Sequence, residues 1–400
     1  MALTKVRGNA VDGGTISTET AGTNNLILGS TAGDSIASGG NYNVCIGDEA
    51  GTALTTGDNN VAVGFEALAT EDANGHNVAV GYRALKTLNA GADAQNTAVG
   101  YNAGLSITTG VENTLVGATA GDAITDADFN VGIGWGALGA NVLGSKSVAV
   151  GTGALDAQNP ASAFNMHNTA VGHGAGGAVT TGYFNTFVGG LAGDATDDGL
   201  YNVALGYLAL SANCGNSNTG IGTSALENTT GANNTAIGLD AGINVSSGSN
   251  NLCIGKDAGI TGSPGGNITS GSNEIALGDE SIASFSCQVS LTATSDERDK
   301  TDFKDLDLGL DFVKALKPVT YVWDKRTNYV DKTDPDWRKT LDLDKITSDG
   351  SKKDDDLQVG FKAQDVIALE EASGYKLSDK TNLTATVTND GKQYGLSYER

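Results

Sequence analysis

The chain has 400 residues, of which 57 are glycine and 4 are proline, and its formal net charge is −23. The scarcity of proline and the lack of glycine at every third position exclude collagen, and the absence of Leu, Lys and Glu heptads excludes a coiled coil. The negative charge excludes a nucleic-acid binder that depends on phosphate neutralisation. No stretch approaches the roughly 20 apolar residues of a membrane span, and the N-terminus lacks the apolar core of a secretory signal.

Charge density divides the chain into two parts. Residues 1–294 contain 6 of the 24 Lys and Arg residues and 24 of the 47 Asp and Glu residues, and they hold most of the glycines. Residues 295–400 form a segment less than half the length of the first, yet they contain the other 18 Lys and Arg residues and the other 23 Asp and Glu residues. A change of this size indicates a domain boundary, which we place between Thr294 and Ser295.

The first part is a repeat of about 17 residues, which we expect from residue 25 onward. Each copy has a glycine that follows an aliphatic residue. The fifteen anchor glycines are Gly29, Gly47, Gly64, Gly81, Gly100, Gly117, Gly134, Gly151, Gly172, Gly189, Gly206, Gly222, Gly238, Gly255 and Gly278. The first and third residues before each glycine are Val, Ile, Leu or Thr, and the second is usually small. Alternation with a period of two predicts a short β-strand. We expect the branched residues to fill the core and the small residues to face another surface.

Two further positions of the repeat are nearly constant. The residue four before the glycine is Asn in thirteen copies, with Ser147 and Glu274 as the exceptions. The residue three after the glycine is Ala in fourteen copies, with Ser281 in the last. We expect the Asn side chains to form a ladder between coils and to cap the turns, and Ala to fit a crowded interior.

The repeat therefore predicts a mainly β protein with a parallel β-solenoid, because stacked coils share a core that one coil cannot form alone. Fifteen rungs at roughly 4.8 Å each make a rod of roughly 70 Å. Two arrangements are open, namely chains that coil on themselves and associate as a trimer, which we favour, and three interwoven chains. The rod can act as a rigid spacer or as a binding surface. It resembles the heads of trimeric autotransporter adhesins and the repeat arrays of phage tail fibres.

The second part has the pattern of a small α+β domain. Apolar residues from about 307 to 316 predict a helix that Pro318 ends, and Val319–Trp323 then predicts a strand. Residues 324–356 are rich in Asp and Lys, which indicates a solvated insertion. The sequence LQVGFKAQDVIALEEA predicts a strand that leads into a helix, and YGLSYER ends the chain.

Four motifs in this part resemble the endosialidase-type intramolecular chaperone, a self-cleaving C-terminal module of phage tail spikes and fibres. They are SDERDK at 295–300, LKPVTYVWD at 316–324, VGFKAQDV at 359–366 and YGLSYE at 394–399. The resemblance implies that the module brings three chains into register and then cuts the chain between Thr294 and Ser295. It assigns Ser295 as the nucleophile and Lys300 as the general base, which a lowered lysine pKa would permit. From the spacing alone, Ser295 can equally be a helix N-cap and Lys300 a solvated side chain.

Other residues that could form sites are better explained as structural. Cys45 and Cys253 occupy small-residue positions of the strands, so we expect buried thiols. The histidines and the Asp-rich turns lack the spacing of a metal site, and we expect neither a metal nor a cofactor. Aromatic residues follow several anchor glycines and can form an outward stripe that either binds carbohydrate or lies between chains. These residues are Phe65, Tyr82, Tyr101, Trp135 and Tyr207.

The sequence thus favours a trimeric phage tail fibre that attaches to a host receptor, for which a glycan is the expected class. It would assemble in the host cytoplasm and reside in the virion. Residues 1–24 would dock on other virion proteins, residues 25–294 would form the shaft, and residues 295–400 would form the chaperone. One alternative is a glycan-degrading tailspike with active sites between subunits. Another is a bacterial surface adhesin, which the missing export signal and C-terminal barrel disfavour.

Overall fold

The computed structural model describes residues 20–282, 285, 298, 301–302, 308–331, 341–379, 381–387 and 394–396. Contacts within the chain group its residues into two units, Met1–Thr223 and Ser224–Arg400. The expected N-terminal docking segment, residues 1–24, lies mostly outside the described residues.

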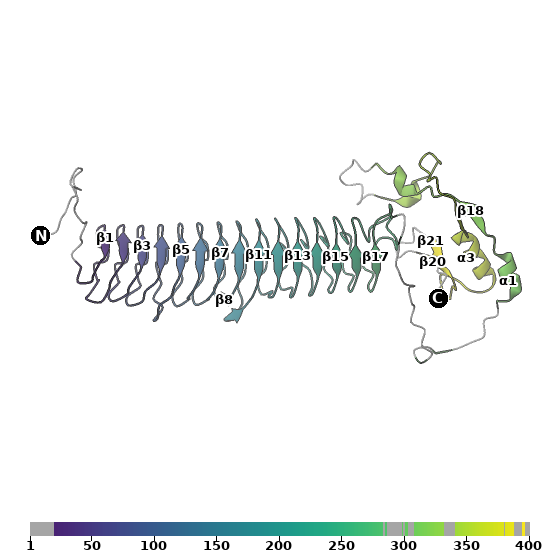
Figure 1. Cartoon of the computed structure of the whole chain (residues 1–400). Coiled ribbons are helices and arrows are strands. Elements are labelled where there is room, and N and C mark those ends of the chain that lie inside the picture. The colour runs from purple at the N-terminus through teal and green to yellow at the C-terminus, as the bar shows by residue number, and fades with distance from the viewer. Residues whose placement is uncertain are drawn as a thin grey trace. The chain divides into compact units, whose positions relative to one another are not determined.

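The first unit consists of stacked coils, each of which contributes one short strand to a single sheet. Figure 1 shows these strands side by side along the unit. In sheet order they are β1 (Leu26–Leu28), β2 (Val44–Ile46), β3 (Val61–Val63), β4 (Val78–Val80), β5 (Thr97–Val99), β6 (Thr114–Val116), β7 (Val131–Ile133), β9 (Val148–Val150), β11 (Thr169–Val171), β12 (Thr186–Val188), β13 (Val203–Leu205) and β14 (Thr219–Ile221).

Each strand pairs in parallel with the strand of the next repeat. The register is constant, so that Val44 lies beside Val61 and Cys45 lies beside Ala62. Equivalent positions of the repeat therefore form continuous columns along the sheet. The prediction of a mainly β protein with a parallel β-solenoid is confirmed, and the strands of successive repeats pair within one chain, as the self-coiled arrangement requires.

The expected orientation of the strands is wrong. The small middle residues point into the coil, where Ala62, Ala79 and Ala98 are fully buried, whereas the flanking branched residues are half-buried or exposed. The reason is the narrow interior of a 17-residue coil. Ala at the third position after the glycine fills the opposite side of that interior and is buried in every coil of this unit, as expected. Most coils therefore have a small side chain at mid-strand, and Leu or Ile from the turns, such as Leu54 and Ile107, fills the rest of the interior. Leu115 and Phe187 are larger buried mid-strand residues, against which Gly121 and Gly193 lie.

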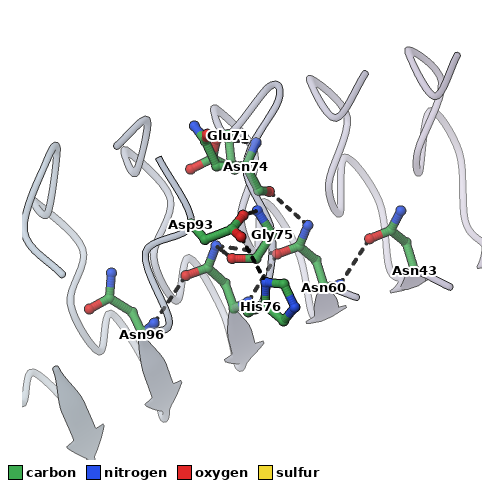
Figure 2. A network of polar contacts seen from close by, with 9 residues as sticks. Asn43, Asn60, Glu71, Asn74, Gly75, His76, Asp93 and Asn96 are labelled. Atoms are coloured by element: carbon green, nitrogen blue, oxygen red, sulfur yellow. Dashed lines mark hydrogen bonds and ion pairs between the residues drawn. The ribbon is translucent and has the colours of Figure 1, made fainter. Parts of the chain in front are cut away.

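A ladder of asparagine side chains joins the coils, as predicted. In each step the Oδ1 atom of one Asn accepts a hydrogen bond from the backbone N–H of the next Asn, at 2.9 Å from Asn60 to Asn43 and at 3.0 Å from Asn77 to Asn60. The Nδ2 group of Asn60 donates to the backbone oxygen of Asn74 at 3.0 Å (Figure 2). These ladder side chains are fully buried. They satisfy backbone groups that would otherwise be buried without a partner.

One interruption of the ladder is repaired from another part of the coil. Ser147 is too short to reach the next coil, and the following interval between anchor glycines is 21 residues. Within this longer coil, the buried Gln158 Oε1 atom accepts hydrogen bonds from Ser147 Oγ at 3.1 Å and from Asn168 Nδ2 at 2.9 Å. The insertion also forms a short parallel pair between β8 (Gly144–Ser145) and β10 (Phe164–Asn165).

The anchor glycine is required by both conformation and space. At Gly117 the backbone φ is +139°, and a Cβ atom would lie 2.4 Å from the backbone oxygen of Gly134 in the next coil. Any larger residue would separate the coils at this corner. Much of the glycine excess in the sequence is explained by this one position.

The second unit contains three more repeat strands and the C-terminal elements. The strands β15 (Thr235–Ile237), β16 (Leu252–Ile254) and β17 (Ile275–Leu277) pair in parallel in that order. The C-terminal elements are α1 (Leu310–Ala315), β18 (Val319–Tyr321), η2 (Arg326–Tyr329), η3 (Leu343–Lys345), β19 (Gln358–Gly360), α3 (Ala363–Ala372), β20 (Ala385–Val387) and β21 (Tyr394–Leu396). The two helices and the strand before Trp323 agree with the sequence prediction, although α1 begins three residues later than expected.

Candidate functional site

The predicted nucleophile Ser295, the predicted base Lys300 and the cleavage-site residue Thr294 all lie outside the described residues. Of residues 294–300 the structure describes only Arg298, which is exposed. The nucleophile and base assignments therefore stay predictions. The remaining three motifs of the C-terminal part can be placed.

Two of these motifs form one antiparallel strand pair. The strand β18 comes from LKPVTYVWD and β19 comes from VGFKAQDV with its preceding Gln, and Val319 lies opposite Gly360. The helix α3 follows β19 after two residues. Segments that are about 40 residues apart in the sequence are thereby brought together.

A buried carboxylate connects the last motif, YGLSYE, to the β18–β19 pair and α3. Glu370 of α3 accepts hydrogen bonds from the backbone N–H of Thr384 at 2.8 Å, from the Thr384 hydroxyl at 2.6 Å and from the backbone N–H of Leu383 at 3.2 Å. Burial alone would raise the pKa of Glu370, but these hydrogen bonds outweigh it and lower the pKa. The strand β20 that follows Thr384 pairs with β21, which contains the YGL of the last motif. Sequence analysis did not single out Glu370, because one Glu in the run ALEEA has no distinguishing pattern.

Asp324 organises the Asp- and Lys-rich insertion. Its Oδ1 atom accepts from the Tyr329 hydroxyl at 2.8 Å, its Oδ2 atom accepts from the Gly350 backbone N–H at 2.8 Å, and its backbone oxygen accepts from Ser348. The Tyr329 hydroxyl in turn accepts from the backbone N–H of Lys352. The insertion is therefore tied at both ends to the end of the β18 motif.

The C-terminal elements leave large apolar side chains exposed. Leu310 and Val313 of α1 are 64% and 59% exposed, and Leu357 and Val359 at β19 are 69% and 76% exposed. An open cavity of about 270 Å³ lies between the end of α1 and the start of α3, lined by residues that include Leu316, Phe361 and Leu369. Exposed apolar surface of this kind is typical of protein–protein interfaces.

The structural explanation of the cysteines is confirmed. Cys45 and Cys253 are fully buried at mid-strand, and burial raises the pKa of their thiols to about 12 and about 11. Thiols with such pKa values are inert at neutral pH.

The histidines contact single neighbours. His76 pairs with Asp93 at 3.3 Å, and His167 stacks on Phe184. Within the described ranges, no three His, Cys, Asp or Glu side chains lie close enough together to hold a metal ion.

Aromatic side chains of neighbouring coils stack on one another at the surface of the first unit. Phe65, Tyr82 and Tyr101 form one ladder with ring centroids 5.5 and 5.2 Å apart and interplanar angles of 18° and 7°. Trp135 and Tyr207 are also exposed, so the outward position of the expected stripe is confirmed.

Sequence reasoning missed a second aromatic ladder. It contains His167, Phe184 and Tyr201, whose centroids are 5.4 and 5.3 Å apart, with Tyr183 and Phe164 against its side. The signal that could have found it is the position five residues before the anchor glycine, which these three residues share.

Comparison with known proteins agrees with the C-terminal motifs. Residues 295–375 match the family described as chaperone of endosialidase. No curated protein and no solved structure matches the chain. No helix within the described ranges has the length and apolar character that a membrane crossing needs.

The chain combines a parallel β-solenoid with a C-terminal segment that matches the endosialidase chaperone family. This combination fits a protein of the tailspike or tail-fibre type.

Proposed function

We propose that the protein is a homotrimeric tail fibre that attaches a virion to its host, with the C-terminal module directing assembly of the trimer. The observation that carries the proposal is the match of residues 295–375 to the chaperone family, directly after the repeat array. The exposed apolar side chains of α1 and β19 support it, because they offer surface for other copies of the module.

We further propose that assembly triggers one cut between Thr294 and Ser295. Lys300 takes the proton from the Ser295 hydroxyl, and Oγ attacks the carbonyl carbon of Thr294. The peptide C–N bond breaks, the proton passes to the new amine, and the chain is left joined by an ester. Water hydrolyses the ester, which releases the Thr294 carboxylate and restores the Ser295 hydroxyl. Loss of the chaperone then leaves the shaft trimer kinetically trapped.

The cleavage step is tested with the full chain and with Ser295→Ala and Lys300→Met. Intact mass and a denaturing gel should show two fragments that meet at Thr294–Ser295 for the unchanged chain, and one full-length chain for each variant. Light scattering should show trimers in all three samples. An unchanged chain that stays full length, as Ser295→Ala does, would refute self-cleavage. A monomeric unchanged chain would refute the trimer.

Attachment is tested separately with purified, labelled fibre. We expect saturable binding to bacterial cells and to their surface polysaccharide, with no change in the length of the polysaccharide. Shortening of the polysaccharide would instead identify the protein as a glycan-degrading tailspike. Absence of binding to any host surface would refute the attachment role.

A further inference from the structure

The outer face of the sheet in the first unit carries aliphatic residues and threonine and no charged residue. We call the first and third residues of strands β1–β7, β9 and β11–β14 the outer stripe. Every residue of the outer stripe is Val, Ile, Leu or Thr. Several of them are exposed to more than a third, including Val99, Val116 and Leu205. A solvent-facing surface of a chain with net charge −23 normally carries charged residues.

A parallel sheet with one bare face is unusual, because parallel sheets occur almost only with both faces covered. In this unit, Ala and Leu side chains from the rest of each coil cover the inner face, as at Ala67 and Leu68. Within the described residues, nothing comparable covers the outer stripe, whose residues are half-buried or exposed along its length. The outer stripe therefore has the composition and exposure of a surface that another protein covers.

Its size fits a stable interface. Twelve strands at about 4.8 Å spacing give a length of about 53 Å, and the width of three residues is about 10 Å. Counted on both chains of a pair, this stripe alone gives an area on the order of 1,000 Å², which is the size that a specific protein–protein interface needs.

The occupant that fits best is another copy of the same chain. The outer stripe repeats along the rod at the spacing of the coils, so an identical stripe running in the same direction matches it strand by strand. If the chaperone modules gather the C-terminal ends of three chains, as the proposed function requires, the three shafts run parallel. This inference rests on that proposed function.

The C-terminal modules would align the three chains at one end, but a repetitive interface also needs something that holds this register along the shaft. Sliding one chain by one coil leaves most strand contacts of the outer stripe intact, because each coil offers nearly the same residues. The two aromatic ladders are different, since they are confined to a few coils. The equivalents of Tyr82 and Tyr101 in other coils include Ala118, Thr152 and Thr223. A slip would move rings against these small residues and leave voids.

We propose that the outer stripe is the subunit interface of a parallel homotrimer, and that the aromatic ladders Phe65–Tyr82–Tyr101 and His167–Phe184–Tyr201 fix its register. The Arg83 guanidinium lies 4.9 Å from the centre of the Tyr82 ring and its Nε bonds Glu66, which holds the first ladder in place. This assignment replaces the expectation that the small side chains face the partner chains.

The test uses single cysteines in the full chain with Cys287→Ser. The native Cys45, Cys214 and Cys253 are buried and do not interfere. Val116→Cys, in the outer stripe, should form disulfide-linked dimers on mild oxidation, because same-numbered residues meet in a parallel trimer. Asn89→Cys is exposed outside the outer stripe and is the matched control, for which we expect no link. Circular dichroism checks that both variants fold.

Register is tested by co-assembling Val116→Cys chains with Ile133→Cys chains. Links between like positions should exceed the mixed 116–133 link by about tenfold, which corresponds to one or two aromatic pairs. The added changes Tyr82→Ala, Tyr101→Ala, Phe184→Ala and Tyr201→Ala should bring the two kinds of link close to parity.

The outcomes separate the two proposals. A trimer by light scattering in which Val116→Cys gives no more link than Asn89→Cys overturns the interface but leaves the trimer standing. A monomer overturns the proposed function itself. Unchanged link ratios after removal of the rings overturn the role of the ladders alone.

Discussion

Replacing a single ladder asparagine should destabilise the shaft measurably. The Oδ1 atom of Asn113 accepts from the Asn130 backbone N–H at 3.0 Å, and its Nδ2 group donates to the Ala127 backbone oxygen at 2.9 Å. Both partners are buried. Asn113→Ala leaves the Asn130 N–H and the Ala127 backbone oxygen without these partners, and each buried group left in this way costs about 1–3 kcal/mol. We expect the free energy of unfolding to fall by about 2–6 kcal/mol.

The measurement is guanidinium unfolding followed by circular dichroism, together with hydrogen exchange of the amides in the coils of β6 and β7. Exchange is the more direct readout, because repeat arrays can open locally. Asn89→Ala is the matched control, since this side chain is exposed, and it should change stability by no more than about 0.5 kcal/mol.

A third variant separates the two hydrogen bonds. Asn113→Asp keeps an oxygen for the Asn130 N–H but cannot donate to Ala127 while it is ionised. We expect it to be strongly destabilised at pH 7 and partly rescued as the pH falls and the carboxyl gains a proton. Equal stability of Asn113→Ala and Asn89→Ala would refute the reasoning that the ladder stabilises the stack.

Three further predictions concern a glycine, a buried glutamate of the shaft and a buried glutamate of the chaperone. Gly117→Ala should prevent regular stacking, because a Cβ atom there would lie 2.4 Å from the Gly134 oxygen. The control Gly153→Ala places its Cβ atom in open space and should lower the stability measured by thermal unfolding by only about 1 kcal/mol. Equal losses of stability in the two variants would contradict the packing argument. Burial raises the pKa of Glu71 despite hydrogen bonds from Asn74, so its contribution to stability is complete below the ordinary Glu pKa and is lost as the pH rises through the raised value. Glu71→Gln should therefore flatten the pH profile of the melting temperature between acid and neutral pH, and an unchanged profile would count against this (Figure 2). The lowered pKa of Glu370 has the opposite sign: its contribution is present above the ordinary Glu pKa and is lost as the pH falls through the lowered value. Glu370→Gln should loosen the hydrogen-exchange protection of β20 at pH 7 but not at strongly acidic pH, and equal protection at pH 7 would show that the carboxylate is not needed.

The sequence by itself determined the parts of this protein that repeat. The anchor glycine, the Asn column and the Ala column each occur at one spacing, and in parallel coils equal spacing becomes equal position. The solenoid, its ladder and its buried alanines therefore follow from the order of the residues alone. The four C-terminal motifs likewise indicated the chaperone family, because their order along the chain is preserved.

Only the tertiary structure decided which way each strand faces. Period-two alternation puts branched and small residues on opposite faces but does not say which face is inside, and the preference of branched residues for cores pointed to the wrong one. The narrow coil decides it, since its interior takes a small residue such as Ala62 at mid-strand. Where the mid-strand residue is large, as at Leu115 and Phe187, a glycine lies against it, as Gly121 and Gly193 do. The repair by Gln158 and the anchoring by Glu370 were equally hidden, because each depends on side chains that folding alone brings within hydrogen-bonding distance.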